Sequence, residues 1–245
     1  MKYLFLLLVT FIIFPLLSDL AKWSIYNQKA IHTETDLSKI TYEESGVKIY
    51  TNNNFNIFIF DPKKVKFGVS NSRPINKKFY MNSNFFNKVP IGLVVIDGVK
   101  KSSRVRGGGY LYVIDGKVDV KRGSCPTYTD YASQSILWGI DNGAINETLI
   151  KQSHAKKLAY RNIVGKNKDG LIIFVVSKYG GIVTIKEVIK EGLNQGMVEG
   201  VIFDGGSSVE YKFDDGQYST SFMSLSDVGK KLLGIDKPTT YIYVD

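Results

Sequence analysis

Cysteine and histidine are scarce in this chain, and their scarcity narrows its chemistry. The 245 residues include one cysteine, Cys125, and two histidines, His32 and His154. A single cysteine excludes a disulfide within the chain, even in the oxidising compartments where disulfides form. Only two histidines could activate Cys125, which precedes Pro126 in an expected loop, so we do not expect a catalytic thiol. No acidic or amide spacing is diagnostic of a metal, so we expect no cofactor, and a divalent cation stays open.

Apolar runs as long as those of secretory signal peptides are missing from the chain except at its start. Lys2 is followed by residues 4–17, which are apolar at all but two positions. A basic start and a short apolar stretch are the layout of a secretory signal. Residues 18–21 give no clear cleavage pattern, and the run is shorter than the roughly 20 residues that span a bilayer. We therefore expect residues 1–21 to be a signal peptide or an N-terminal membrane anchor, with residues 3–17 as the tether. The protein is then exported, whether secreted, periplasmic or membrane-anchored facing outside the cytosol.

Linkers rich in proline, glycine or serine are missing from residues 46–245, which we expect to form one domain. Residues 22–45 are polar and irregular, and we expect a lead-in segment there. Strand patterns come in runs with few helices between them, which is typical of an α+β fold and not of a doubly wound parallel sheet. The expected fold class is α+β, a single domain of mixed, largely antiparallel sheets with few helices.

Short alternating or apolar runs predict most of the elements. Two Asp-Gly pairs, at 97–98 and 115–116, separate such runs and predict hairpins, because both turn residues need positive φ. Thr184 and Glu187 fit a capping box, so a helix is predicted from there to a stop near Gly196. The expected strands span residues 47–50, 56–61, 65–70, 92–96, 99–100, 110–114, 117–120, 171–177, 201–203 and 240–244.

Positive charge dominates, with a formal net charge of +9 and a pI near 9.3. A basic exported protein attracts anionic polymers such as phosphoglycans, although the charge also serves solubility. No nucleic-acid motif accompanies the basic residues, so we expect no nucleic-acid partner. The densest basic patch comprises Lys100, Lys101, Arg104 and Arg106.

One acidic turn directly follows an expected strand. Residues 204–208 read Asp-Gly-Gly-Ser-Ser. A carboxylate at a strand end projects at the edge of its sheet, and the glycines let backbone N–H groups approach a ligand. Successive N–H groups form anion sites, and serine hydroxyls add donors. A plain Gly-Gly turn remains the alternative for this segment.

Two further segments carry side chains suited to sugars and phosphates. Residues 82–86 read Asn-Ser-Asn-Phe-Phe, with amides for sugar hydroxyls beside aromatic rings. An asparagine that caps a turn is the alternative there. Arg161, just before the apolar run at 171–177, could contact a phosphate through two N–H groups. A surface arginine at the start of a hairpin is the alternative.

Taken together and in this order, these segments resemble the phosphodiester glycosidase family over roughly residues 75–245. Residues 82–86 are similar to its Asn-Gly-x-Phe-Phe motif, with Ser83 in place of glycine. Residues 161–165 are similar to its Arg-Thr-Ala-x-Gly motif, and residues 203–207 to Leu-Asp-Gly-Gly with serine. After Gln134, the chain lacks the Gly-Pro pair common in the family.

The resemblance implies an exported hydrolase that cleaves a glycosidic bond, with a sugar-1-phosphodiester in a glycan or cell-envelope polymer as the expected substrate. Asp204 would act as a base or steady an oxocarbenium-like state, while Arg161 and nearby N–H groups hold the phosphate. Asn82 and Asn84 would orient the sugar. The expected catalytic residues are Asp204, Arg161 and Asn84, and the expected substrate-binding residues are Asn82, Gly205, Gly206, Ser207 and Ser208.

A second catalytic carboxylate is not evident, although glycosidases usually use two. Glu187 is a candidate whose capping-box role already explains it, and Glu210 and Asp141 are weaker candidates. The sequence does not reveal the sugar or the stereochemical outcome. Two alternatives stay open: a non-catalytic module that binds glycan or envelope polymers on the same fold, and a glycosidase that acts on non-phosphate glycosides.

Overall fold

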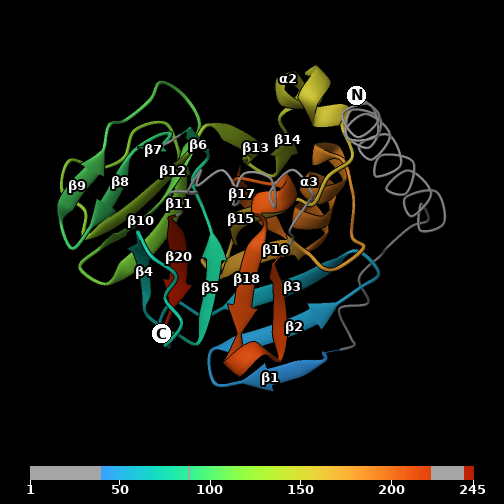
Figure 1. Ribbon diagram of the computed structural model, residues 1–245, viewed down its shortest axis with the longest axis horizontal. Helices are drawn as coiled ribbons and strands as arrows, with labels where there is room; N and C mark the ends of the chain where they lie inside the picture. Colours follow the sequence, from blue (N-terminus) through green and yellow to red (C-terminus); the bar gives the residue numbers. More distant parts are fainter. Residues whose placement is uncertain (1–39, 88, 222–239) are drawn as a thin grey trace, which may run out of the picture.

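The computed structural model describes residues 40–87, 89–221 and 240–245 of the chain (Figure 1). The predicted signal peptide or anchor over residues 1–21 lies outside the described residues, as does most of the lead-in segment. Within the described ranges, no helix is long and apolar enough to span a membrane.

The largest sheet has eight strands, and every pairing in it is antiparallel. Its central strand β16 is fully buried, so apolar residues occupy both faces. Phe174 faces one core cluster, whereas Ile173 and Val175 face another. In sheet order the strands are β1 (Tyr42–Glu44), β2 (Val47–Thr51), β3 (Phe55–Phe60), β16 (Ile172–Ser177), β15 (Asn162–Asn167), β17 (Met197–Ile202), β13 (Leu137–Asp141) and β14 (Ala144–Ile145).

Two five-stranded antiparallel sheets and one two-stranded ribbon complete the strands of the described residues (Figure 1). The first sheet has the order β11 (Lys117–Arg122), β10 (Gly109–Ile114), β12 (Tyr131–Ser135), β8 (Val94–Ile96) and β9 (Val99–Ser102). The second has the order β19 (Tyr218–Ser221), β18 (Glu210–Phe213), β5 (Phe79–Asn82), β20 (Tyr241–Val244) and β4 (Phe67–Ser70). The ribbon pairs β6 (Phe86–Asn87) with β7 (Val89–Pro90).

Helices cover one face of the eight-stranded sheet. The longer helix, α3 (Ile185–Asn194), buries Ile185, Val188 and Ile189 against the sheet in the same cluster as Ile163 and Ile202. The short helical segments are α2 (Glu147–Ile150), η1 (Ser153–Lys156), η2 (Gly206–Ser208) and η3 (Asp214–Gly216).

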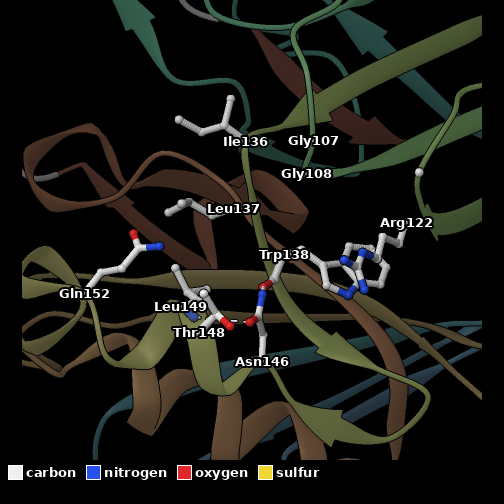
Figure 2. Close-up of a pocket in the computed structure, with 11 residues that line it drawn as sticks. Gly107, Gly108, Arg122, Ile136, Leu137, Trp138, Asn146, Thr148, Leu149 and Gln152 are labelled. Atoms are coloured by element: carbon white, nitrogen blue, oxygen red, sulfur yellow. Dashed lines mark hydrogen bonds between the residues drawn. The ribbon is translucent and has the colours of Figure 1, made fainter.

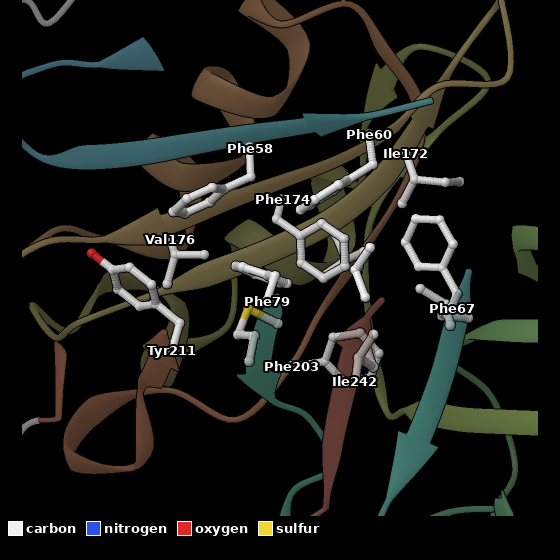
Figure 3. Close-up of a cluster of buried hydrophobic side chains, with 14 of the residues drawn as sticks. Phe58, Phe60, Phe67, Phe79, Ile172, Phe174, Val176, Phe203, Tyr211 and Ile242 are labelled. Atoms are coloured by element: carbon white, nitrogen blue, oxygen red, sulfur yellow. The ribbon is translucent and has the colours of Figure 1, made fainter. Parts of the chain in front are cut away.

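The main core lies on the other face of the eight-stranded sheet, where phenylalanine rings join it to the second five-stranded sheet (Figure 3). Phe79 of β5 contacts Phe58 of β3 and Phe174 of β16, with ring centroids 4.9 Å apart in both pairs. Tilted and edge-on ring pairs add to the hydrophobic burial that holds the layers together. The molecule is therefore layered, with helices, a large sheet and smaller sheets in succession.

The expected α+β class with largely antiparallel sheets is confirmed. Both predicted Asp-Gly hairpins form, and Asp97 and Gly98 have φ of 50° and 72°. The expected irregular lead-in is wrong for its last residues, since β1 pairs with β2 there and extends the sheet. Among the strands that the pattern missed are β13 and β12, and buried polar residues conceal the strand alternation of β12.

Candidate active site

Asp204 and Arg161 come from neighbouring antiparallel strands and meet at one edge of the eight-stranded sheet. Strand β17 ends at Ile202, just before Asp204, and β15 begins at Asn162, just after Arg161. The backbone N–H of Phe203 donates to Asn162 Oδ1 over 3.1 Å, which continues the contact between the two strands beyond the sheet ladder. Residues separated by more than forty positions are thus adjacent at this edge, because antiparallel pairing puts the end of one strand beside the start of the other.

The backbone of Asp204 is held by the other two segments that the sequence singled out, residues 82–86 and 161–165. Its N–H donates to the carbonyl of Ser83 over 2.9 Å. Its carbonyl accepts hydrogen bonds from Asn82 Nδ2 at 2.9 Å and from Asn162 Nδ2 at 2.8 Å. The Asp204 residue is half-buried. Three backbone hydrogen bonds fix the position from which its carboxylate projects.

Arg161 is held by backbone carbonyls but retains a donor. Its Nη2 donates to the carbonyls of Lys157 at 2.8 Å and His154 at 3.3 Å. Its Nε is buried and has no hydrogen-bond partner among the described residues. Burial lowers the pKa of Arg161, and the charge of Asp204 opposes that shift. Because a guanidinium stays protonated in proteins, the side chain presents a positive charge and a buried N–H to this edge.

The Gly-Gly turn packs directly against Arg161. A Cβ atom at Gly205 would lie 2.8 Å from the carbonyl oxygen of Tyr160 and 3.6 Å from Arg161 Nη1, so only glycine fits this approach. The Gly206 N–H, which we expected to face a phosphate, instead donates to the Tyr160 carbonyl over 2.8 Å. That donor is therefore already used within the fold. Ser207 and Ser208 belong to η2, and the N–H of Ser208 donates to the Gly205 carbonyl.

Asn82 and Asn84 have polar atoms that the fold already occupies. Asn82 is 2% exposed, and its Oδ1 accepts from the Glu210 N–H at 3.0 Å. Asn84 is 4% exposed, and its Nδ2 donates to the Gln134 carbonyl over 2.8 Å. Asn84 Oδ1 accepts from Thr240 Oγ1 at 3.0 Å. We expected both amides to touch a sugar, but these contacts make them part of the framework that supports the edge.

The three candidates for a second carboxylate have structural partners. Glu187 completes the predicted capping box, accepting the Thr184 N–H over 2.7 Å. Glu210 pairs with Arg73, with 2.5 Å between Arg73 Nε and Glu210 Oε1. Asp141 lies at the end of β13 away from the edge and pairs with Arg122. Asp204 is therefore the carboxylate that the geometry places beside Arg161.

Side chains that could ligate a metal, and the thiol of Cys125, are the other chemically reactive groups of the described residues. No group of three or more histidine, cysteine, aspartate or glutamate side chains there is arranged to hold a metal ion. Cys125 is half-buried, and burial raises the pKa of its thiol. A raised pKa disfavours the thiolate, which is the nucleophilic form.

A cavity of about 220 Å³ adjoins this edge (Figure 2). Its lining includes Leu137, which pairs with Ile202 two residues before Asp204. It also includes Gln152, two residues before His154, whose carbonyl holds Arg161. The sequence patterns did not point to this cavity, because its walls come from several loops and strands that are distant in the sequence.

A family model described as phosphodiester glycosidase matches residues 67–228 of the chain. No curated protein sequence matches it. The catalytic domain of zebrafish N-acetylglucosamine-1-phosphodiester alpha-N-acetylglucosaminidase, auto-inhibited by its pro-peptide, has a similar structure. That pair shares 15% identity with a TM-score of 0.58, and the match covers 84% of this chain and 80% of the zebrafish chain.

Two further solved structures share the fold. A hypothetical protein from Synechocystis is 14% identical with a TM-score of 0.55, over 82% of this chain and 60% of that one. A putative exported protein from Burkholderia pseudomallei is 11% identical with a TM-score of 0.51, over 81% and 74% of the two chains. At these identities the likeness concerns the fold.

Proposed function

Because the chain belongs to the phosphodiester glycosidase family, we propose that it is an exported hydrolase that cleaves the glycosidic bond of a sugar-1-phosphodiester. The substrate would be part of a glycan or a cell-envelope polymer, and nucleic acid would not be a partner. One observation carries the proposal: Arg161 presents a buried, unpaired N–H at the sheet edge where the backbone of Asp204 is held. A fixed cation beside a carboxylate suits a substrate with a phosphate next to the bond that breaks.

Arg161 binds the phosphate in this proposal. Its Nη2 is anchored by two carbonyls, so the Nε–H is pre-positioned and little side-chain entropy is lost when a phosphate oxygen arrives. As the anomeric C–O bond breaks, negative charge grows on the leaving phosphate. The guanidinium stabilises that charge, so strong proton donation to the leaving group is unnecessary.

Asp204 serves as the general base. Its carboxylate takes a proton from the attacking water while the water oxygen bonds to the anomeric carbon and the phosphate monoester leaves with the electrons of the broken bond. Asn82 and Asn162 act as positioning residues, since both donate to the Asp204 carbonyl and fix the start of the Gly-Gly turn. Asn84 donates to the Gln134 carbonyl and so ties the segment that carries Asn82 to β12.

The first test is sugar release from an N-acetylglucosamine-1-phosphodiester and from matched glycosides without phosphate. Asp204→Asn should lower kcat on the diester by roughly a hundred- to ten-thousand-fold, because removal of a general base costs about that much. Asp215→Asn is the matched control, since its side chain is exposed on η3. Full activity of Asp204→Asn would remove Asp204 from the mechanism.

The same substrates separate the proposal from its two alternatives. A glycan-binding module would retain affinity for the diester with no turnover in the parent protein. A glycosidase for plain glycosides would hydrolyse the matched compounds at least as fast as the diester. Hydrolysis restricted to the diester, and lost in Asp204→Asn, supports the proposed reaction.

A further inference from the structure

The cavity beside the sheet edge, which we name the β13 pocket, has walls from three parts of the chain. Its lining residues include Gly107, Gly108, Leu137, Trp138, Thr148 and Gln152. They come from the loop before β10, from the start of β13 and from the α2–η1 segment. At about 220 Å³, the pocket is smaller than the roughly 300–1,000 Å³ of sites for drug-sized ligands, so it suits one small ring.

Unused hydrogen-bonding groups line the β13 pocket. Trp138 is 4% exposed, and its Nε1 has no partner within the described residues. A buried N–H without a partner costs free energy, so a ligand that accepts from it gains affinity. The exposed side chains of Thr148 and Gln152 make no hydrogen bond to any described residue. Figure 2 shows Trp138 on one side of the pocket and Gln152 on the other.

The β13 pocket combines these donors with apolar surface and little net charge. Ile136 and Leu137 supply apolar lining. Arg122, the charged residue of the lining, is paired with Asp141, with 2.5 Å between Nη1 and Oδ2. That pairing largely neutralises it, whereas Arg161 keeps a free donor outside the pocket. A neutral ring with hydroxyl groups matches this lining better than a phosphate does.

The loop that closes the β13 pocket is fixed before any ligand binds. Gln134 Nε2 donates to the carbonyls of Val105 at 2.8 Å and Gly107 at 2.9 Å. A Cβ atom at Gly108 would overlap the carbonyl oxygen of Ser135, so the backbone there packs without a gap. A preformed wall of this kind lowers the entropy cost of binding.

We propose that the β13 pocket is the subsite for the neutral sugar ring that the hydrolysis releases. Leu137 pairs with Ile202 just before Asp204, and the segment after Gln152 holds Arg161, so a ring in this pocket lies next to the groups that act on its phosphate. The role of the pocket in the reaction rests on the proposed function, whereas its ability to bind a sugar can be tested separately with a free sugar. Trp138, Thr148 and Gln152 bind the ring hydroxyls.

The test is a titration of the ¹⁵N-labelled full chain with free N-acetylglucosamine, followed through the tryptophan indole N–H signals. The chain has two tryptophans, and Trp138→Phe identifies the signal of Trp138 by its loss while keeping an aromatic ring in place. The Trp138 signal should shift saturably with the sugar and stay in place with inorganic phosphate. Gln152→Ala should weaken sugar binding roughly three- to tenfold, as expected for one lost hydrogen bond.

Gln217→Ala is the matched control, because Gln217 is exposed at the end of η3 and does not line the pocket. In diester hydrolysis, Gln152→Ala should raise KM with kcat little changed, since Gln152 binds the ring equally well in the ground state and in the transition state. A Trp138 signal that ignores the sugar, or moves with phosphate, overturns the subsite even if hydrolysis is found. A saturable shift without any hydrolysis supports the subsite and overturns the proposed reaction.

Discussion

Arg161 illustrates how a side chain can be anchored by the fold and still keep a hydrogen-bond donor for a ligand. Two backbone carbonyls hold its Nη2, and the glycine at 205 leaves room for the guanidinium to lie against the turn. Sequence patterns singled out Asp204 because it directly follows the apolar run at 201–203, and this arginine because it precedes the apolar run at 171–177. The same patterns could not foresee that the Gly206 N–H is used by Tyr160, since that contact depends on how two loops cross.

Arg161→Lys keeps the charge but loses the planar fork that carbonyls and a phosphate share. We expect kcat/KM on the diester to fall roughly 10- to 100-fold, as for the loss of one charged hydrogen bond. Steady-state kinetics would show this, with Arg106→Lys as the exposed control. Parent-like kinetics in Arg161→Lys would mean that phosphate binding needs only a positive charge.

Glu199 provides a pH-dependent prediction. Burial raises the pKa of its carboxyl above the ordinary 4.5, and the nearby charge of Asp141 raises it further. Its Oε2 is buried without a partner among the described residues. A carboxyl with a raised folded-state pKa binds more protons when folded, so its contribution to stability is lost as pH rises from 4.5 through that raised pKa.

Glu199→Gln removes this titration. Urea unfolding at several pH values should show the variant gaining free energy of unfolding relative to the parent as pH rises above about 4.5. The exposed Glu147→Gln serves as the comparison. A difference between variant and parent that stays constant with pH would contradict the raised pKa.

Helix α3 and the hairpins were predictable at the scale of elements, because local chemistry alone determines them. The capping box at Thr184 forms with both of its hydrogen bonds, and Gly196 follows the helix with φ of 82°. Strand β12 was missed because Ser133, Gln134 and Ser135 are polar yet fully buried. Their partners lie far along the chain, so no local pattern marks them as interior.

Thr184→Ala should lower the free energy of unfolding by about 1 kcal/mol, the usual cost of losing an N-cap side chain. Denaturant titration measures this, and Thr127→Ala in an exposed loop is the matched control. Equal losses in the two variants would mean that the cap contributes nothing beyond a generic threonine substitution.

The arrangement of the sheets is the least predictable feature at the scale of the whole molecule. The α+β class followed from runs of strand patterns with few helices. The strand order did not follow, because β20 inserts between β4 and β5, and nothing local specifies that neighbour. Thr240, just before β20, donates a hydrogen bond to Asn84. The position of β20 in the sheet therefore affects the framework of the candidate site.

Ile242 is one of two side chains through which β20 joins the main core (Figure 3). It is fully buried, so Ile242→Ala should cost about 2–5 kcal/mol of unfolding free energy through lost contacts and a cavity. Ile75→Ala, at a position that is 60% exposed, should stay within about 0.5 kcal/mol of the parent. A small loss at Ile242 in thermal or denaturant unfolding would show that the second sheet tolerates weak packing of β20, one of its interior strands.

The position of β20 has a consequence for the order of synthesis. The register pairs Ile242 with both Val69 and Met81, so β4 and β5 cannot gain their shared neighbour until the ribosome has released residue 242. Until then, those two strands present unpaired edges toward the position of β20, and unpaired edges attract other chains. From the synthesis of β4 and β5 until that of β20, the nascent chain carries an incomplete second sheet, and we expect it to depend on chaperone protection during that interval.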